Sequence, residues 1–359
     1  MKRILPLLIT FFALIVITGC GVHSVTVIDE TATLERIEIE DGDAVNTYNE
    51  PLRVVATIFP QFDFIRQIAG DRVELSMLLS PGAESHGFEP TPRDVISIYG
   101  ADLLVYVGGH GDVWVDPILA SIGRDDMRTV ALIDLVDAVM VDHHHHGHDH
   151  GHDHHHHDHD HGHDHHHHDH DHRHDHGHHH HHEPHYDEHV WTCPRNAILI
   201  VEELVAVLAE LDPSNAYYFN ENANTFIAQL QDLDRDFTQV VADGVRSTVV
   251  FGDRFPMRYL TDTYGLTYYA AFTGCSAETQ ASPATIAYLI QKVQEEDIPV
   301  VFYIEFSNRL IADVIAEATG ARLLEFHSLH NVSPSDFAEG LTYLDLMRRN
   351  MGVLREALS

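Results

Sequence analysis

The sequence predicts an α/β fold of two lobes, each with a central, mostly parallel sheet flanked by helices, joined by one long rigid helix. Two observations lead to this fold class. Short β-branched runs alternate with longer amphipathic stretches, and a repeated strand-then-helix order is typical of a parallel sheet. Between the two alternating halves, one amphipathic stretch keeps a helical period for about 30 residues, long enough to connect two lobes.

The first lobe is expected over residues 51–213. Apolar runs bounded by turn residues predict its strands, and apolar residues three or four apart predict its helices. In chain order we expect a strand at 53–59, a helix at 61–69, a strand at 73–79, a helix at 91–100, a strand at 102–107 and, after a long insertion, a helix at 196–211.

The linking helix is expected over residues 214–243, and the second lobe over residues 244–359. The apolar positions of the linking helix keep one face, and they are Tyr218, Phe226, Ile227, Leu230, Leu233, Phe237 and Val240. The second lobe then repeats the strand-and-helix order, with strands at 247–251, 266–272, 300–304 and 322–326, and helices at 258–264, 282–297, 309–319 and 335–358. A helix as long as 214–243 would act as a stiff hinge.

The insertion in the first lobe, residues 142–185, is dominated by histidine. Of the 34 histidines in the chain, 27 lie between His143 and His182, interleaved with Asp and Gly, and an eleven-residue run starting at His150 recurs unchanged at His161. Neutral imidazole is the commonest protein ligand for zinc, copper and nickel, and carboxylates add oxygen donors that suit zinc. We therefore interpret the insertion as a solvated metal-collecting arm. Its role in capture, sensing or storage stays open.

The N-terminal residues predict export and membrane attachment. A basic start at Lys2 and Arg3 precedes an apolar run that ends in Gly19-Cys20, which is typical of a lipoprotein signal peptide over residues 1–20 with lipidation at Cys20. Residues 21–50 are polar and acidic without a clean period, as in a flexible tether. We expect an extracytoplasmic protein that the N-terminal lipid anchors to the cell membrane.

Composition excludes several function classes. The formal net charge is −35, with only two lysines, so the phosphates of nucleic acid would be repelled. Neither a His-Glu-x-x-His helix, a Gly-x-Ser-x-Gly elbow nor a Gly-rich phosphate loop occurs, so we expect no enzyme. The mature chain retains Cys193 and Cys275, and their spacing does not decide whether they pair.

Candidate ligands follow the predicted strands. In open parallel sheets, ligands bind beyond the carboxyl ends of the strands. His86 and His110 come after first-lobe strands, and His189 comes directly after the arm. In the second lobe, Asp253, Glu278, Glu305, His327 and His330 occupy the corresponding positions.

At these residues the chain resembles the metal-binding lipoproteins of bacterial ABC importers for zinc and manganese. The resemblance covers residues 51–358 and is carried by the run Ser80-Pro-Gly-Ala-Glu-Ser-His-Gly-Phe-Glu-Pro-Thr-Pro92, by His189-Val-Trp191 just after the His-rich insertion, by Asp212-Pro with residues 217–222, and by Tyr264-Gly-Leu266. It implies one metal ion held between two lobes and delivered to a membrane permease, with an ATPase subunit on the cytoplasmic side. By position, His86 and His189 match the family's two first-lobe histidine ligands.

The second lobe departs from the family pattern. Where zinc-binding members have His before Asp-Ala-Phe, this sequence has Gly252-Asp253-Arg254-Phe255, and the Asp expected after His-Val-Trp is missing. Because zinc takes about four donors, another strand end must supply the third ligand. We expect His327, which directly follows a strand, together with Glu278. His110, His330 and Asp253 are further possible ligands.

Three histidines favour zinc as the transported ion over manganese, which prefers more oxygen donors. A manganese-binding member of the same family and a surface His-rich zinc store or chaperone remain the alternative functions.

Overall fold

The computed structural model describes residues 50–84, 87–140, 186–274 and 281–359. It contains two four-stranded sheets, and all the strand pairings within them are parallel. The α/β fold class predicted from the sequence is confirmed. No helix among the described residues is long and apolar enough to cross a membrane.

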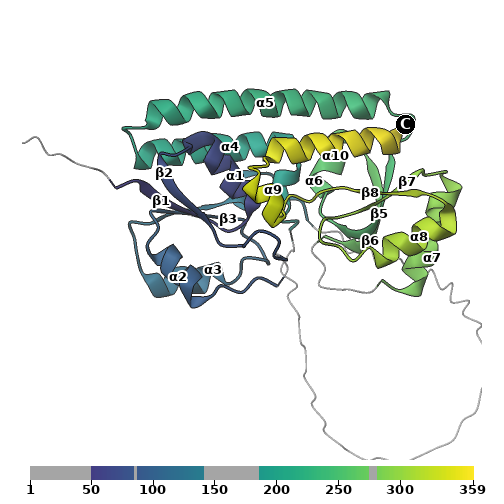
Figure 1. Cartoon of the computed structure of the whole chain (residues 1–359), viewed down its shortest axis with the longest axis horizontal. Helices are drawn as coiled ribbons and strands as arrows, with labels where there is room; N and C mark the ends of the chain where they lie inside the picture. The colour runs from purple at the N-terminus through teal and green to yellow at the C-terminus, as the bar shows by residue number, and fades with distance from the viewer. Residues whose placement is uncertain (1–49, 85–86, 141–185, 275–280) are drawn as a thin grey trace, which may run out of the picture. The chain divides into compact units, whose positions relative to one another are not determined.

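The first sheet has the strand order β2-β1-β3-β4 (Figure 1). Its strands are β1 (Leu52–Ala56), β2 (Val73–Met77), β3 (Leu103–Tyr106) and β4 (Arg128–Ala131), and they alternate with α1 (Phe59–Ala69), α2 (Pro92–Tyr99) and α3 (Val115–Ile122). A 3-10 helix, η1 (Leu132–Leu135), follows β4. The sequence analysis assigned neither α3 nor β4. Strand β4 lies at the edge of the sheet and only Val130 in it is buried, so it lacks the continuous apolar run of a central strand.

The second sheet has the equivalent order β6-β5-β7-β8. Its strands are β5 (Thr248–Phe255), β6 (Thr267–Thr273), β7 (Val300–Tyr303) and β8 (Arg322–Glu325), and they alternate with α6 (Arg258–Tyr264), α7 (Pro283–Glu295) and α8 (Leu310–Thr319). Both lobes therefore use one winding order. Strand β5 runs past the predicted end at residue 251, with a register shift between Phe251 and Arg254.

Neighbouring residues on the central strands are buried on opposite faces. Val54 and Val300 belong to a core shared by both lobes, whereas Val55 and Val301 belong to separate cores, under α2 and α3 and under α7 and α8 respectively. Burial on both faces explains why these strands read as continuous apolar runs rather than as alternating ones.

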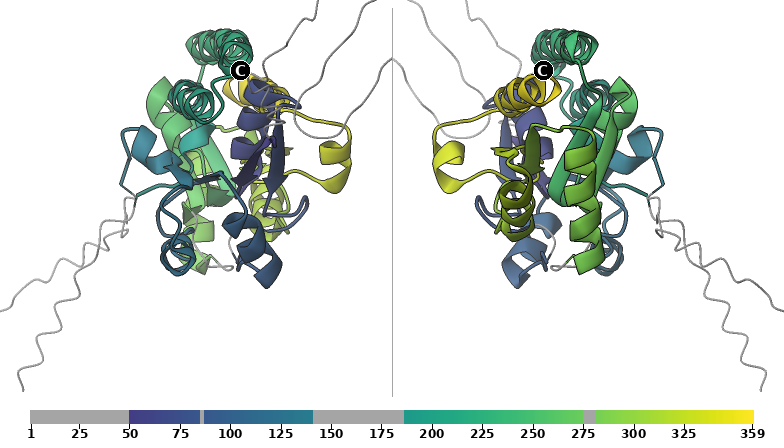
Figure 2. Two further views of the ribbon diagram at one scale, coloured as in Figure 1. Left: turned by 90° about the vertical axis from the view of Figure 1, so that its left-hand side faces the viewer. Right: turned by 90° about the vertical axis from the view of Figure 1, so that its right-hand side faces the viewer.

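A layer of helices covers the shared core (Figures 1 and 2). It contains α1, α4 (Pro194–Leu211), α5 (Ala216–Asp243) and α10 (Tyr343–Leu358), and α5 packs against the other three. The buried positions of α5 follow a spacing of three and four residues, and they are Phe219, Ala223, Phe226, Leu230, Leu233, Phe237 and Val240. Helices α1 and α4 belong to the first lobe and α10 to the second, so α5 contacts both lobes.

One helix differs from the expectation. The stretch 335–358 is divided into α9 (Pro334–Ala338) and α10 because Gly340 takes a left-handed conformation with φ +74°, and Thr342 then caps α10. The break places the start of α10 against α1. There the buried carboxylate of Asp63 accepts a hydrogen bond from the backbone N of Tyr343 at 2.6 Å, and burial raises the pKa of Asp63.

Candidate metal site

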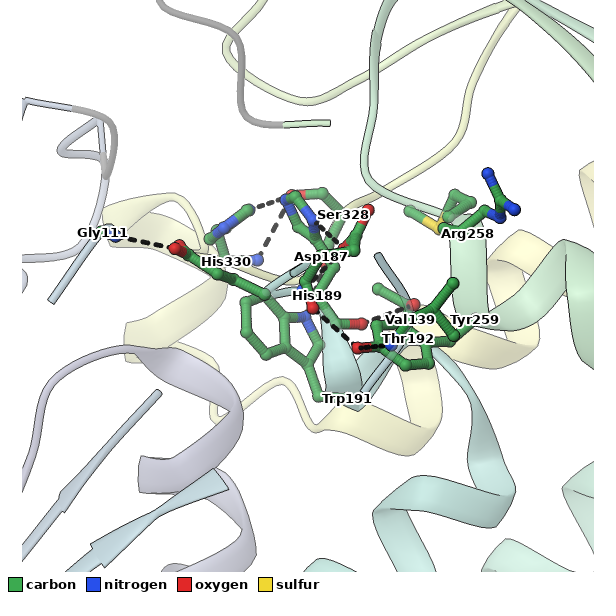
Figure 3. Close-up of polar contacts among 12 residues, drawn as sticks. Gly111, Val139, Asp187, His189, Trp191, Thr192, Arg258, Tyr259, Ser328 and His330 are labelled. Atoms are coloured by element: carbon green, nitrogen blue, oxygen red, sulfur yellow. Dashed lines mark hydrogen bonds and ion pairs between the residues drawn. The ribbon is translucent and has the colours of Figure 1, made fainter. Parts of the chain in front are cut away.

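The candidate site lies where the first lobe meets the loop that follows β8 (Figure 3). On the first-lobe side, the short 3-10 helix η2 (Val190–Thr192) carries Trp191, which is fully buried. The indole Nε1 donates to the backbone oxygen of Ser328 at 2.9 Å, and the backbone oxygen of Trp191 accepts from the Tyr343 hydroxyl at 2.7 Å. These bonds hold the η2 segment against the second lobe.

His189 immediately precedes η2 and is buried, with 1% of its surface exposed. Its Nδ1 lies 2.7 Å from Asp187 Oδ1, which also accepts the backbone N–H of His189 at 2.9 Å. A neutral imidazole that donates from Nδ1 keeps its lone pair on Nε2, the nitrogen that then binds a metal ion. Asp187 therefore selects the tautomer that a metal ligand needs.

His330 approaches His189 from the second lobe. The two rings are nearly perpendicular, with centroids 4.7 Å apart, and His330 also lies edge-on to Trp191 at 4.8 Å. Nδ1 of His330 lies 3.0 Å from the Ser328 hydroxyl, which in turn donates to the buried carboxylate of Glu305. The other oxygen of Glu305 accepts the backbone N–H of Ser328 at 2.7 Å.

The two histidines thus have matching support from opposite lobes. His189 is oriented directly by Asp187, and His330 is oriented through Ser328 by Glu305. Metal-ligating histidines almost always donate their second ring nitrogen to a carboxylate or another acceptor, which raises the basicity of the nitrogen that binds the metal. Two imidazoles oriented in this way can serve as nitrogen donors to a metal ion.

A cavity beside His330 is lined by both lobes. Glu84 lines it from the first lobe, and Arg254, Glu305 and Asn331 line it from the second. Arg254 Nη1 lies 3.3 Å from Glu84 Oε1, and Asn331 Nδ2 donates to the backbone oxygens of Ser80 and Ala83 at 2.8 and 2.9 Å. These contacts hold the loop that leads to His86, although His86 itself lies outside the described residues.

His327 is placed differently from His330. Its Nδ1 accepts the backbone N–H of Leu329 at 2.9 Å and lies 3.7 Å from a Glu305 oxygen, while Asn350 bonds to its backbone N–H and C=O. The sequence analysis ranked His327 ahead of His330. The geometry favours the reverse order, because the ring of His330 is the one that contacts His189.

Asp253 lies within β5 rather than after it, and its carboxylate accepts the backbone N–H groups of Arg254 and Ile304. The neighbouring Gly252 stands where the family has its histidine. A Cβ there would lie 2.5 Å from the Cα of Ala312 in α8, so the strand position has no room for an imidazole. The close approach of α8 to the sheet thus leaves no space for a side chain at Gly252.

The other candidates are only partly described. The loop of exposed His110 is tied to the residue before His189, because Gly111 donates to Glu188 Oε1 at 2.8 Å (Figure 3). Glu278, Cys275 and Cys20 lie outside the described residues, as do all residues of the arm. Within the described ranges, no group of three or more His, Cys, Asp or Glu side chains is arranged to hold a metal ion.

Sequence reasoning did not single out the supporting groups. Glu305 was noted only as a polar residue after a strand, and Asp187 and Ser328 were not considered as part of a site. A carboxylate two residues before a candidate histidine was the available signal for Asp187. No sequence signal connects Glu305 to His330, since their link requires β7 and β8 to be neighbours.

Comparison with known proteins is consistent with this geometry. A family model described as zinc-uptake complex component A, periplasmic, matches residues 54–357. The high-affinity zinc uptake system protein ZnuA of Bacillus subtilis is 29% identical over 315 residues, covering 88% of this chain and 90% of that protein. The zinc-binding protein AdcA of Streptococcus pyogenes is 29% identical over 307 residues, covering 85% of this chain but 55% of AdcA, so this chain spans about half the length of that relative.

Two solved structures share the fold. The metal-dependent lipoprotein YcdH of Bacillus subtilis has a TM-score of 0.67 at 26% identity, covering 86% of this chain and all (100%) of that chain. The Zn(II)-bound ZnuA-like domain of Streptococcus pneumoniae AdcA has a TM-score of 0.64 at 23% identity, covering 86% of this chain and 98% of that chain. Together with the match over residues 54–357, these relatives show that the chain belongs to the family of zinc-uptake complex component A proteins.

Proposed function

We propose that this chain is the extracytoplasmic substrate-binding protein of an ABC importer and that it captures Zn²⁺ between its two lobes. One observation carries the proposal. His189 of the first lobe and His330 of the second lie against each other. Nδ1 of His189 faces the buried Asp187 carboxylate, and Nδ1 of His330 faces the Ser328 hydroxyl, which donates to the buried Glu305 carboxylate. Two imidazoles oriented in this way from separate lobes suit an ion that holds the lobes together.

The proposed ligands are His86, His189 and His330, with Glu278 as the fourth donor. His86 follows Glu84, which lines the cavity beside His330. Glu278 follows Gly274, which bridges to Phe255 next to the cavity residue Arg254. The described residues Glu84 and Arg254 thus lie beside the cavity that His330 also lines. His327 remains the alternative nitrogen ligand.

This ligand set favours zinc over manganese. Three imidazoles and one carboxylate match the tetrahedral N/O environment that zinc prefers, whereas manganese prefers more oxygen ligands. The named zinc proteins among the relatives support the same choice. A manganese-binding protein of the same family is the second candidate.

The family acts in transport rather than catalysis, and its members work with a permease and an ATPase. We infer that this chain delivers zinc to such a permease and that a lipid on Cys20 holds it at the cell membrane. One relative, AdcA of Streptococcus pneumoniae, is named a zinc-binding lipoprotein, which supports the lipid anchor. The His-rich arm would then collect ions near the site.

Metal analysis combined with hydrogen exchange tests the proposal on the full chain. We expect protein purified without added metal to retain one tightly bound zinc, and one equivalent of zinc added to stripped protein to raise its melting temperature. The same equivalent should slow exchange in both the 80–90 and the 325–332 loops. His189→Ala should abolish both the rise in melting temperature and the slowed exchange. His110→Ala, which changes an exposed loop histidine outside the proposed ligand set, is the control and should leave both unchanged. Protection confined to one lobe would contradict capture between the lobes, and a purely store-like protein would show no single tight ion.

A further inference from the structure

The described residues on either side of the His-rich arm pair with each other. Met140 and Tyr186 form an antiparallel bridge, and the backbone N–H of Asp187 donates to the oxygen of Val139 at 2.8 Å. We call residues 139–140 together with 186–187 the arm root. The root ends two residues before His189, so the covalent path from the root to this proposed zinc ligand is short.

One side chain of the second lobe joins both strands of the arm root. Tyr259 of α6 is 4% exposed, and its hydroxyl donates to the backbone oxygen of Asp187 at 2.7 Å (Figure 3). The same hydroxyl accepts the backbone N–H of Val139 at 3.2 Å. Burial raises the pKa of Tyr259 to about 12, so the hydroxyl keeps the proton that it donates.

Asp187 is thereby held at both of its ends. Its backbone oxygen is bonded to Tyr259, and its carboxylate accepts both the ring N–H and the backbone N–H of His189. Rotation of the imidazole would break its hydrogen bond to the carboxylate, and displacement of the Asp187 backbone would break the bond to Tyr259. A chain of three hydrogen-bonded residues thus runs from α6 to the histidine.

We propose that Tyr259 is a positioning residue for zinc binding: it clamps the arm root and so keeps Asp187, and through it His189, in the metal-binding orientation. The inference rests on the proposed function, because it assumes that His189 binds zinc. It assigns a role to a residue that does not contact the ion.

Tyr259→Phe tests the clamp, since it removes the hydroxyl and leaves the ring. Tyr264→Phe is the matched control. It lies on the same helix, and its hydroxyl donates to Asp234 Oδ1 at 2.9 Å, away from the arm root. Tyr259→Phe loses two hydrogen bonds and Tyr264→Phe loses one, and we expect both variants to melt at a lower temperature than the unmodified chain.

Only Tyr259→Phe should change the metal site. Loss of a residue that orients a metal ligand typically weakens metal binding 10- to 100-fold, and Tyr259 acts one bond further away, so we expect the Kd of the tightest zinc to rise about 3- to 10-fold. One equivalent of Co²⁺, whose visible absorption bands report ligand geometry, should give shifted bands in Tyr259→Phe. Tyr264→Phe should keep the original Kd and bands.

Three results would overturn the clamp: an unchanged Kd and cobalt spectrum in Tyr259→Phe, equal changes in both variants, or rapid exchange of the Val139 and Asp187 amides in the unmodified, metal-free chain. The last measurement needs no variant, so it decides the matter even if Tyr259→Phe fails to fold. If the unmodified chain binds no zinc tightly, the proposed function is refuted instead. Failure of the clamp and failure of the proposed function therefore give different results.

Discussion

Replacing His330 and His327 separately by Ala distinguishes a zinc ligand from a structural histidine. The apparent free energy of zinc binding to a four-ligand protein site is about 10–16 kcal/mol, so one ligand contributes roughly 3 kcal/mol. At about 1.4 kcal/mol per tenfold change, His330→Ala should weaken the tightest zinc site about 100-fold. His327→Ala removes the acceptor that Nδ1 offers to the Leu329 N–H. That loss should cost about 1 kcal/mol of folding stability and change the zinc Kd less than about threefold.

The assay is competition for zinc between the full chain and a chromophoric chelator, read at less than one equivalent of zinc so that the tightest site fills first. The arm is the same in both variants, so its weaker sites cancel in the comparison. Urea unfolding of the metal-free proteins gives the stability change in parallel. The assignment of His330 fails if His327→Ala raises the zinc Kd as much as His330→Ala does, and the ligand would then be His327.

Two further predictions concern the arm and pH. Deleting residues 142–183 should leave the lobes folded, because a polar surface insertion adds little to any core, and the deleted chain should keep one tight zinc while it loses the weaker ions. In the full chain, those weaker ions should dissociate below about pH 6, where imidazole protonates. Arm-dependent zinc that stays bound at pH 5 in equilibrium dialysis would contradict imidazole ligation. Asp112→Asn should stabilise the metal-free chain at pH 7 by up to about 3 kcal/mol and have little effect near pH 4, as measured by urea unfolding. Burial raises the pKa of Asp112 to about 6, despite hydrogen bonds from the N–H groups of Val107 and Gly108. Between about pH 4 and 6 the folded carboxyl therefore holds a proton that the unfolded chain has already lost. The free energy of unfolding falls as the pH rises through this range. Equal stability of the two proteins at pH 7 would refute this prediction.

The close contact of the two lobes bears on how the protein moves. The lobes share one hydrophobic core under α5, and buried polar bonds cross between them, among them Asp63 to Tyr343 and Trp191 to Ser328. A wide hinge opening would have to expose that core. We therefore expect zinc to order the loops around His189 and His330 with a small tilt of the lobes.

Much of the fold was determined by the sequence alone. Strands with both faces buried read as continuous apolar runs, and the amphipathic period of α5 is independent of what it packs against, so both are local signals. The place of the arm and the candidacy of His189 also follow from local motifs. The sequence missed α3 and the edge strand β4, in which only Val130 is buried. It merged α9 with α10 because the left-handed turn at Gly340 does not interrupt an otherwise helical pattern.

The tertiary structure alone decided which residues converge. His327 and His330 are equally plausible after a strand, and only the packing of the β8 loop against Trp191 places His330, rather than His327, on His189. The same packing turns Asp187, Glu305 and Tyr259 into supports, and it shows that α8 lies too close to Gly252 for a side chain there. A metal site needs donor atoms within a few ångströms, and residues as distant in sequence as 189 and 330 reach that separation only through the contacts of the folded lobes.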